Sequence, residues 1–496
     1  MDHQKNQRLT VEIEDIGMNG EGIGRVGGYT LFVKDAIPGD LAEVSLTKVK
    51  KTYAYARLLR VIESSKDRIC APCPIHRQCG GCQIQALSYE GQLAFKQNKV
   101  KNDLIRIGGI DETYLSSILE PIVGMPEKSA DKKEIKGRGF RYRNKAQYPI
   151  GKSRDGEIIA GFYARRTHSI IQTEDCLLGP KINRLIVDTV IKHMKNCGIP
   201  PYDEETGTGT VRHVMIRHAF ESGKIMVCII INDRSLKRPE ELVKALRAVD
   251  GVASVYLNIQ TEKTNVILGE ECILLWGEDS IGDTIHVCDA DRDFAYTDES
   301  LTFHISPLSF YQVNPVQTEW MYSQALGFLN LQGTETVWDL YCGIGTISLF
   351  LAKHAKRVIG VEIVEQAVED ARENARQNGI GNAEFFAGKA EEILPEYYRT
   401  QEDDEMKRPD VIVVDPPRKG CDEKCLETMV RMQPDKIAYV SCDPATLARD
   451  VKYLSENGYL LTKVRAFDNF PQTVHVETVT LLERKEYDHT SDPAAV

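Results

Sequence analysis

The chain has 496 residues, of which 42% are hydrophobic and 27% are charged, and its formal net charge is −11. This length exceeds what one hydrophobic core supports, which predicts two or three domains, and the composition is that of an ordinary globular protein. Because no apolar run is long enough to cross a bilayer and residues 1–10 lack the apolar core of a signal peptide, we expect a cytoplasmic protein with no membrane partner.

The 13 cysteines are scattered through the chain. In a reducing compartment, an odd number of cysteines in a long chain argues against a disulfide framework. Clustered cysteines are then candidates for binding a metal, and isolated cysteines are candidates for packing or catalysis.

Residues 1–64 predict a small closed β-barrel. The segment LTVEIEDIG alternates apolar and polar residues, a glycine-rich turn follows, and YTLFVKDAIPGDLAEVSL continues with short strands. Short strands separated by Gly and Pro-Gly turns are typical of such barrels. The stretch resembles a TRAM domain, an OB-like RNA-binding module, and this resemblance implies contact with RNA.

Two basic stretches are interleaved with aromatic residues. From Lys132 to Lys145 the chain reads KKEIKGRGFRYRNK, with seven basic residues and the single acid Glu134, and KVKKTYAYARLLR runs from Lys48 to Arg60. Cations that hold phosphates, together with rings that stack bases, form the surfaces that bind single-stranded RNA. A solvated protein surface is the alternative for either stretch alone. The overall negative charge does not exclude a local RNA-binding patch.

Residues 65–300 predict a central domain of the α+β class. Cysteines crowd between Cys70 and Cys82, a helical pattern runs from Tyr89 to Ile107, and strands and helices then mix without any repeat. We expect the crowded cysteines to bind a metal centre within this domain.

Residues 301–496 predict an α/β domain of the Rossmann-like type. The strand-like segments TVWDLY, RVIGVEIV, DVIVVD and KIAYVS alternate with helical segments, and one of these helices ends at Gly379, as a helix C-cap should. Alternation of this kind builds a parallel sheet with helices on both faces.

The first of these strands leads into a glycine turn. Gly343 and Gly345 allow the backbone to turn tightly and approach a ligand closely, and Glu362 ends the next strand, where an acid binds ribose hydroxyls. A nucleotide-binding dehydrogenase is the alternative, but the third glycine of the dinucleotide fingerprint is missing. The run DLYCGIGT instead resembles motif I of the class I methyltransferases, which implies S-adenosylmethionine as the cofactor.

Two further motifs follow neighbouring strands. Asp415 begins DPPR after one strand, and Cys442 lies in SCDP after the next, so both should border one crevice at the carboxyl edge of the sheet. Asp443 and Pro444 suit the N-cap and the first position of a helix. The N-terminus of that helix would favour a thiolate at Cys442, whereas a packing cysteine is the alternative.

The C-terminal domain resembles the RumA/TrmA family of RNA uracil-5 methyltransferases. The motifs SFYQVNP, DLYCGIGT, DPPRKG, YVSCDPATLARD and TVHVE occur in the family's order between residues 300 and 485. The resemblance implies that Cys442 is the nucleophile and that Glu477 is the general base. It also implies that the S-adenosylmethionine site contains Gln312, Tyr341, Glu362 and Asp415. Lys389 departs from the pattern, because family members often have Asp or Asn at that place.

Uracil chemistry explains why a thiolate is required. Carbon 5 of uracil is a poor nucleophile. Attack of a thiolate on carbon 6 makes an enolate whose carbon 5 takes the methyl group, and a base must then remove the proton from carbon 5 so that the sulfur leaves. Glu477, near the last strand, is the best candidate for that base. The target uridine should be flipped out of its stack to reach the crevice.

Cys73, Cys79 and Cys82 form a compact set, and Cys176 follows the basic segment. Four thiolates hold either zinc or an iron–sulfur cluster, and their spacing does not separate the two. The resemblance to RumA-type members implies a [4Fe-4S] cluster on these four cysteines, with a role in structure or RNA contact. The resemblance assigns no role to Cys70.

The RNA target follows from the same resemblance. Members that combine a TRAM-like barrel with this cysteine set mostly act on 23S ribosomal RNA, so we expect that RNA as the partner, with transfer RNA as the alternative substrate. Arg418 and the motif around Cys442 argue against a methyltransferase that acts on adenine or cytosine nitrogen. The intact Cys442, Glu477 and glycine turn argue against a non-catalytic RNA-binding factor. We expect the protein to be a monomer.

Overall fold

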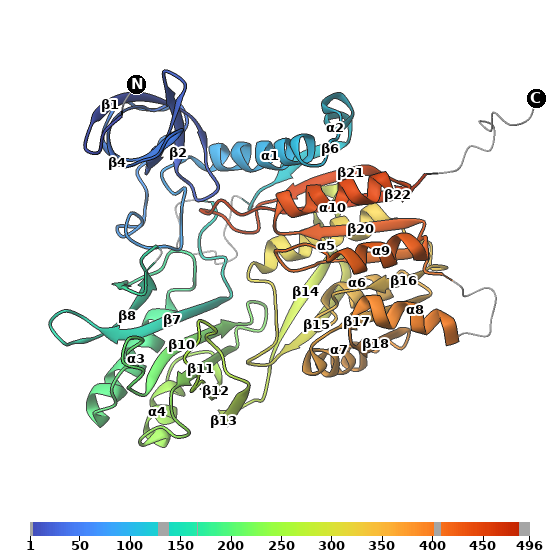
Figure 1. Ribbon diagram of the computed structural model, residues 1–496. Helices are drawn as coiled ribbons and strands as arrows, with labels where there is room; N and C mark the ends of the chain where they lie inside the picture. Colours follow the sequence, from blue (N-terminus) through green and yellow to red (C-terminus); the bar gives the residue numbers. More distant parts are fainter. Residues whose placement is uncertain (1–2, 127–137, 166, 401–407, 486–496) are drawn as a thin grey trace, which may run out of the picture.

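The computed structural model describes residues 3–126, 138–165, 167–400 and 408–485 (Figure 1). Three large sheets and one two-stranded sheet organise this part of the chain. A barrel lies at the N-terminal end, a seven-stranded sheet forms the central domain, and an eight-stranded sheet forms the C-terminal domain. No helix within these residues is long and apolar enough to cross a membrane.

The N-terminal barrel closes in the order β1-β2-β3-β5-β4. Its strands are β1 (Arg8–Ile16), β2 (Gly22–Val26), β3 (Tyr29–Lys34), β4 (Leu41–Val49) and β5 (Tyr53–Glu63). Alternate residues along each strand point inward, as a closed sheet requires, and the interior is filled by side chains such as Val11, Leu31 and Val44. The predicted closed barrel is confirmed.

The central sheet has the order β13-β12-β11-β10-β7-β8-β9. Its strands are β7 (Lys145–Lys152), β8 (Ile158–Tyr163), β9 (Ile170–Gln172), β10 (Val211–His218), β11 (Ile225–Ile231), β12 (Val252–Ile259) and β13 (Glu271–Gly277). Helices α3 (Ile182–Cys197) and α4 (Pro239–Leu246) pack on one face. The other face shares a core with the hairpin β14 (Ile281–Asp289) and β15 (Ala295–Ile305) and with the C-terminal domain. Covered faces on both sides explain why β10 and β11 are buried throughout.

The C-terminal sheet has the order β18-β17-β16-β19-β20-β22-β21-β6. Five neighbouring strands are parallel: β16 (Thr336–Asp339), β17 (Arg357–Glu362), β18 (Ala383–Ala387), β19 (Val411–Val414) and β20 (Lys436–Ser441). β22 (Glu477–Arg484) then runs antiparallel to both β20 and β21 (Tyr459–Phe467). This arrangement confirms the predicted Rossmann-like fold.

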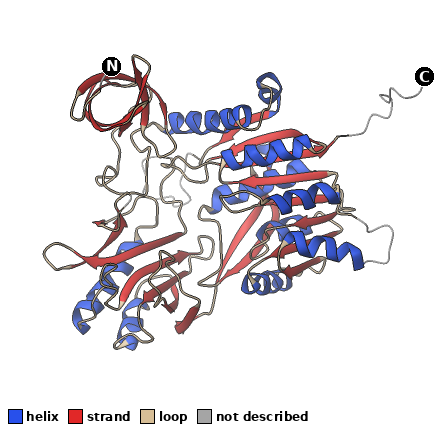
Figure 2. Cartoon of the chain, viewed as in Figure 1, coloured by secondary structure: helices blue, strands red, loops and turns tan. Residues whose placement is uncertain are grey.

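Helices cover both faces of this sheet (Figure 2). One core contains residues of α5 (Pro315–Leu329), α6 (Thr346–Ala352) and α7 (Glu365–Gln377), and the other contains residues of α8 (Ala390–Thr400), α9 (Glu423–Met432) and α10 (Pro444–Glu456). Gly379, just beyond α7, has a left-handed φ of 66°, as the predicted helix end requires.

The predicted domain division differs from the structure before residue 124. Helix α1 (Tyr89–Arg106) packs against α10, and α2 (Glu112–Ile118) leads into β6 (Leu119–Val123), which pairs with β21 at the edge of the C-terminal sheet (Figure 1). Sequence position suggested the central domain for this segment. Its partners lie more than 300 residues away along the chain, and no local pattern reveals such a pairing.

Candidate active site

Cys442 and Glu477 face each other across two paired strands. Cys442 directly follows β20, and Glu477 is the first residue of β22. Ser441 pairs with Thr478 in the antiparallel register of these strands. One further step of the same register places Cys442 opposite Glu477, since antiparallel partners advance in opposite directions. The structure therefore brings the predicted nucleophile and the predicted base together.

The N-terminus of α10 follows Cys442. The Asp443 carboxylate accepts hydrogen bonds from the backbone N–H of Ala445 at 3.0 Å and of Thr446 at 3.5 Å, and Pro444 begins the helix. The predicted N-cap and first helical residue are confirmed. Asp443 thus satisfies two of the N–H groups that would otherwise attract an anion.

The thiol of Cys442 does not meet the expectation of a stabilised thiolate. Its pKa is raised to about 12, chiefly by burial and then by the carboxylates of Glu477 and Asp415, and Arg418 opposes the shift. A negative sulfur at this position would lose its hydration beside two acidic groups. This shift opposes the stabilised thiolate that the sequence suggested and favours a protonated Cys442 thiol in the free protein.

Glu477 is a buried carboxyl group. It is 2% exposed, and burial is the largest cause that holds its pKa well above the usual range. The neighbouring Asp415 raises this pKa too, whereas a hydrogen bond from Asn469 and the charge of Arg418 oppose the shift. Within the described residues its Oε2 atom has no hydrogen-bond partner. A buried carboxyl with one unbonded oxygen is suited to exchange a proton with a bound molecule.

Asp415 lies directly after β19 and completes the acidic group. Desolvation raises its pKa to about 7, and Asp339 at the end of β16 adds to the shift. The Gln312 Nε2 donates a hydrogen bond to Asp415 at 3.3 Å. Gln312 is itself held by Asn144, which donates to its backbone oxygen at 2.8 Å. The predicted residues Asp415 and Gln312 therefore lie together with Cys442 and Glu477.

The glycine turn opens a second part of the crevice. Gly343 and Gly345 have φ angles of 53° and 84°, which favour glycine. The backbone N–H of Gly343 donates to Glu362 at 3.2 Å, and the other Glu362 oxygen accepts from Val364 at 3.0 Å. Glu362 is thereby fixed at the end of β17. These contacts give the turn the shape that the sequence predicted.

A cavity of 530 Å³ lies beside this turn. Tyr341 and Glu362 line it, as does Lys389. The ammonium group of Lys389 lies 3.5 Å from Glu392 on the surface. Lys389 therefore lines the cavity with the aliphatic part of its side chain. Gln312 and Asp415 are not among the cavity's lining residues. The six predicted site residues thus fall into two adjoining groups, one at the turn and one at Cys442.

Asp339 connects these two groups, and the sequence reasoning missed it. Its carboxylate accepts a hydrogen bond from Ser348 at 2.6 Å, and burial raises its pKa to about 6. The charge of Asp339 raises the pKa of Asp415, and the charge of Glu362 raises the pKa of Asp339. The signal was present in the sequence, because Asp339 is the first residue of the run DLYCGIGT.

Helix α1 holds the loop that precedes Glu477. Lys96 and Asp468 are fully buried and form an ion pair, and the Lys96 ammonium also donates to the Phe470 carbonyl at 3.0 Å. The Tyr89 hydroxyl donates to the other oxygen of Asp468 at 2.7 Å. Gln92 exchanges two hydrogen bonds with Gln472, at 2.9 and 3.1 Å. The loop that carries Asn469 to Glu477 is thus anchored on a helix from the other end of the chain.

The four cysteines of the predicted cluster line one cavity of 420 Å³. Cys70 is exposed and does not line it. Tetrahedral zinc with Zn–S bonds of about 2.3 Å would hold its sulfurs about 3.8 Å apart. Among the described residues, the set whose ligand atoms lie within 4.8 Å of one another is elsewhere, at His193, Cys197 and Glu241. The four sulfurs are therefore spaced more widely than a single ion requires.

The basic stretch that ends at Lys145 is not an RNA-binding surface in its described part. Phe140 and Tyr142 are buried together with Leu178. Arg141 is 8% exposed and donates to Asp175 at 2.6 Å and to the carbonyls of Cys176 and Gly179. The prediction is wrong for these residues, because they fix the loop that carries Cys176. Residues 132–137 lie outside the described residues.

Comparisons with known proteins agree with this geometry. A tRNA (Uracil-5-)-methyltransferase family model matches residues 255–485, and a TRAM domain model matches residues 3–59. The chain is 45% identical over 482 residues to an uncharacterized RNA methyltransferase of Halalkalibacterium halodurans, covering 97% of this chain and 98% of that protein. It is 44% identical over 480 residues to another from Clostridium tetani, covering 97% of each. The chain belongs to the RNA uracil-5 methyltransferase family.

A solved structure supports the whole architecture of this methyltransferase. The tRNA (uracil-54, C5)-methyltransferase of Pyrococcus abyssi, in complex with S-adenosyl-L-homocysteine, superposes with a TM-score of 0.70. The two chains are 26% identical, and the match covers 95% of this chain and 99% of that one. The predicted family, the TRAM barrel and the Rossmann-like domain are confirmed. Membership of the family makes S-adenosylmethionine the methyl donor.

A groove in the methyltransferase runs from the barrel to the loop before Glu477. It has a volume of 1140 Å³ and is lined by cations and rings of the barrel, by the loop after β8 and by the loop before Glu477, including Lys34, Tyr55, Arg57, Tyr163, Arg165, His168 and His475. The rings of Phe32 and Tyr55 lie 5.5 Å apart, and those of Tyr163 and His168 are stacked at 5.2 Å. The second basic stretch, which supplies Tyr55 and Arg57, thus borders a groove with the chemistry predicted for RNA binding.

Proposed function

We propose that this methyltransferase methylates carbon 5 of a uridine in RNA through a covalent adduct between Cys442 and carbon 6. The observation that carries the proposal is the position of Cys442 opposite Glu477 at the carboxyl edge of the sheet. A nucleophile and a base on facing strands can act on adjacent carbons of one flat ring.

The proposed reaction consists of attack by sulfur, methyl transfer and elimination. The Cys442 sulfur bonds to carbon 6, its proton passes to the ionised Asp415, and the ring electrons move to the oxygen on carbon 4. S-adenosylmethionine supplies an electrophilic methyl group, which carbon 5 takes. The ionised Glu477 then removes the proton from carbon 5, and the double bond of the ring is restored as the bond between carbon 6 and sulfur breaks. The electron pair of that bond goes to the Cys442 sulfur, which takes its proton back from Asp415. The raised pKa of Glu477 makes its ionised form a stronger base than an exposed carboxylate.

We propose 23S ribosomal RNA as the substrate. The TRAM barrel and the four-cysteine set occur together in this chain, and the groove between barrel and active site suits a single strand rather than a duplex. A transfer RNA is the second candidate, because the structurally similar protein from Pyrococcus abyssi is a tRNA methyltransferase.

The substrate is testable by mapping 5-methyluridine in total RNA from a strain that lacks this protein. We expect the modification to disappear from 23S ribosomal RNA and to return when the wild-type chain, but not Cys442→Ala, is restored. Loss confined to transfer RNA would establish the alternative substrate. An unchanged modification pattern in both RNAs would contradict the proposed function.

We also propose that Cys73, Cys79, Cys82 and Cys176 bind a [4Fe-4S] cluster. Support comes from the four thiols around one cavity and from their wide spacing. The four thiolates would each bind an iron ion of the cluster. Methyl transfer uses no electron, so its role would be to hold the Cys82 and Cys176 loops. The neighbouring Gln83 N–H donates to the Gln472 carbonyl at 3.0 Å, which links this region to the active-site loop.

Cluster loss should follow from changing one ligand. Protein purified without oxygen should be brown and contain iron and sulfide, and Cys79→Ser should remove the iron because three thiolates hold a cluster poorly. Cys70→Ser is the matched control and should keep its full iron content, since Cys70 lies outside the cavity. Untreated protein with one zinc and no sulfide would show that the assignment is wrong.

A further inference from the structure

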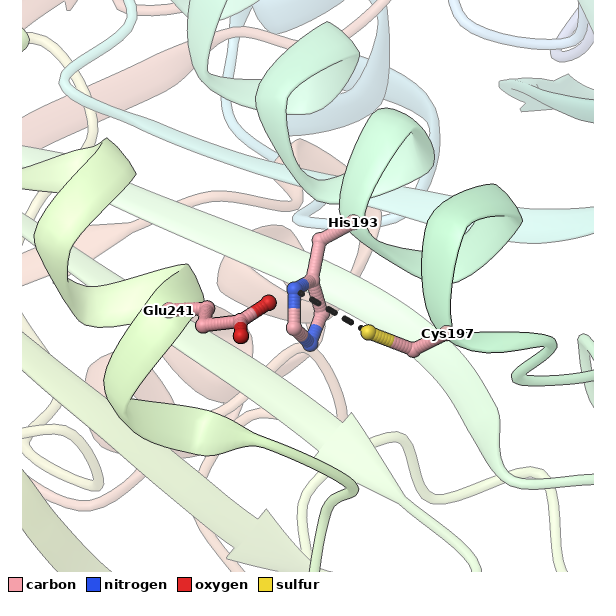
Figure 3. A group of neighbouring side chains, drawn as sticks. All are labelled: His193, Cys197 and Glu241. Carbon is pink, nitrogen blue, oxygen red and sulfur yellow. Dashed lines mark hydrogen bonds between the residues drawn. The ribbon is translucent and has the colours of Figure 1, made fainter.

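A second group of metal-binding side chains lies in the central domain, apart from the four cysteines. His193 and Cys197 are four residues apart on α3 and so share one side of the helix. Glu241 comes from the first turn of α4, which packs beside α3, and its carboxylate points toward the imidazole (Figure 3). The ligand atoms of the three residues lie within 4.8 Å of one another.

The imidazole of His193 is held in the orientation that a metal ligand needs. Its Nε2 lies 3.0 Å from the backbone carbonyl of Lys237, so this nitrogen carries the proton and donates. The other nitrogen, Nδ1, then directs its lone pair at Cys197 and accepts a hydrogen bond from the thiol at 3.8 Å, whose proton a metal ion would replace. Metal-binding histidines almost always donate their second N–H to a carbonyl or carboxylate in this way. His193 is buried, which limits other uses of that lone pair.

We propose that His193, Cys197 and Glu241 form a zinc site. One imidazole, one thiolate and one carboxylate match the ligands of Zn²⁺. Bonds of about 2.05 Å to nitrogen and about 2.3 Å to sulfur at a tetrahedral angle separate these atoms by about 3.6 Å. The observed 3.8 Å is close to this value. Cys197 is half-buried and Glu241 is exposed, so a water molecule completes the coordination from the solvent side.

Binding requires only a small change in the free protein. The Glu241 carboxylate lies 2.5 Å from the guanidinium of Arg238, and both side chains are largely exposed. Exposed ion pairs contribute little to stability, so Glu241 exchanges this partner for a metal ion at small cost. The bound ion would join α3 to α4 above the central sheet. It would lie outside the crevice that contains Cys442 and would stabilise the domain without entering methyl transfer.

Zinc binding is testable with the full-length protein loaded with iron. The protein is equilibrated with buffered free Zn²⁺, and zinc and iron are measured by mass spectrometry. We expect one zinc per chain in the wild type. Cys197→Ser, His193→Gln and Glu241→Gln should each weaken zinc binding at least about tenfold, because even outer-shell partners change affinity by 10–100-fold. The matched controls Cys272→Ser and Glu240→Gln should bind zinc like the wild type.

The iron content reports whether each variant remains folded. Zinc should raise the melting temperature of the wild type and of the two controls, but not that of the three ligand variants. Equal zinc binding by the wild type and Cys197→Ser would overturn the proposal. So would a loss of zinc on removing the iron ligand Cys79, because zinc would then occupy the four-cysteine site. A wild-type chain that takes up no zinc at micromolar free ion would overturn it as well.

Discussion

Cys442→Ala should abolish methyl transfer, with a rate decrease on the order of 10⁴-fold or more, as expected when the nucleophile of a covalent enzyme is removed. The variant should also form no covalent complex with RNA. Incorporation of label from S-adenosylmethionine into RNA measures the first effect, and denaturing electrophoresis measures the second. Cys70→Ala, which changes an exposed cysteine, is the control and should keep full activity. A Cys442→Ala enzyme that still methylates uridine would contradict the proposed mechanism.

Glu477→Gln separates the base from the nucleophile within the same experiment. This variant should still attack carbon 6 and transfer the methyl group, and then stall with RNA attached, because an amide cannot accept the proton from carbon 5. The stalled complex should contain the labelled methyl group. RNA with 5-fluorouridine should trap the wild type in the same manner, since fluorine does not leave as a cation. Normal turnover by Glu477→Gln would move the base elsewhere, and His475, which lines the groove, would be the next candidate.

Lys96→Met should have the largest effect on stability. The substitution leaves the Asp468 carboxylate fully buried without its cation, and such losses cost about 3–5 kcal/mol. Because Asp468 precedes Asn469 in the active-site loop, we also expect a lower kcat. The KM for S-adenosylmethionine should not change, since the loop does not line the cavity beside the glycine turn. Chemical denaturation and steady-state methylation measure the two effects.

Two further variants make this prediction specific. Adding Asp468→Asn to Lys96→Met should recover part of the stability, because the neutral amide removes the unpaired charge and still contacts Tyr89. Lys101→Met is the matched control on the same helix, since its ion pair with Glu112 is exposed, and it should change stability little. Equal effects of Lys96→Met and Lys101→Met would show that the buried pair does not anchor the loop.

Local patterns in the sequence predicted most of the active site. The strands, the glycine turn and the N-cap at Asp443 each depend on residues a few positions apart, and parallel strands bring their carboxyl ends to one edge. Asp415 and Cys442 could therefore be placed near one another, whereas Glu477, which begins an antiparallel strand, was assigned to the site by the family resemblance. The protonated thiol could not be predicted, because its pKa depends on burial and on carboxylates from two other strands.

Long-range pairs account for the features that sequence reasoning missed. The ion pair of Lys96 with Asp468 joins residues 372 positions apart, and Lys96 alone resembles any polar residue on a helix. Arg141 shows the converse error. Its basic, aromatic neighbourhood has the composition of an RNA surface, but the same side chains can pack inward and bind carbonyl oxygens, and composition does not distinguish these two uses.

The position of β6 has a consequence for dividing the chain. The strand comes before the central domain in sequence but forms the edge of the C-terminal sheet, so the chain leaves that sheet, builds the central domain and returns. The central domain is therefore an insertion within the catalytic unit. A fragment that began at residue 301 would lack both this edge strand and Lys96. It would expose the backbone of β21 to pairing with other chains and would bury Asp468 without a counter-ion.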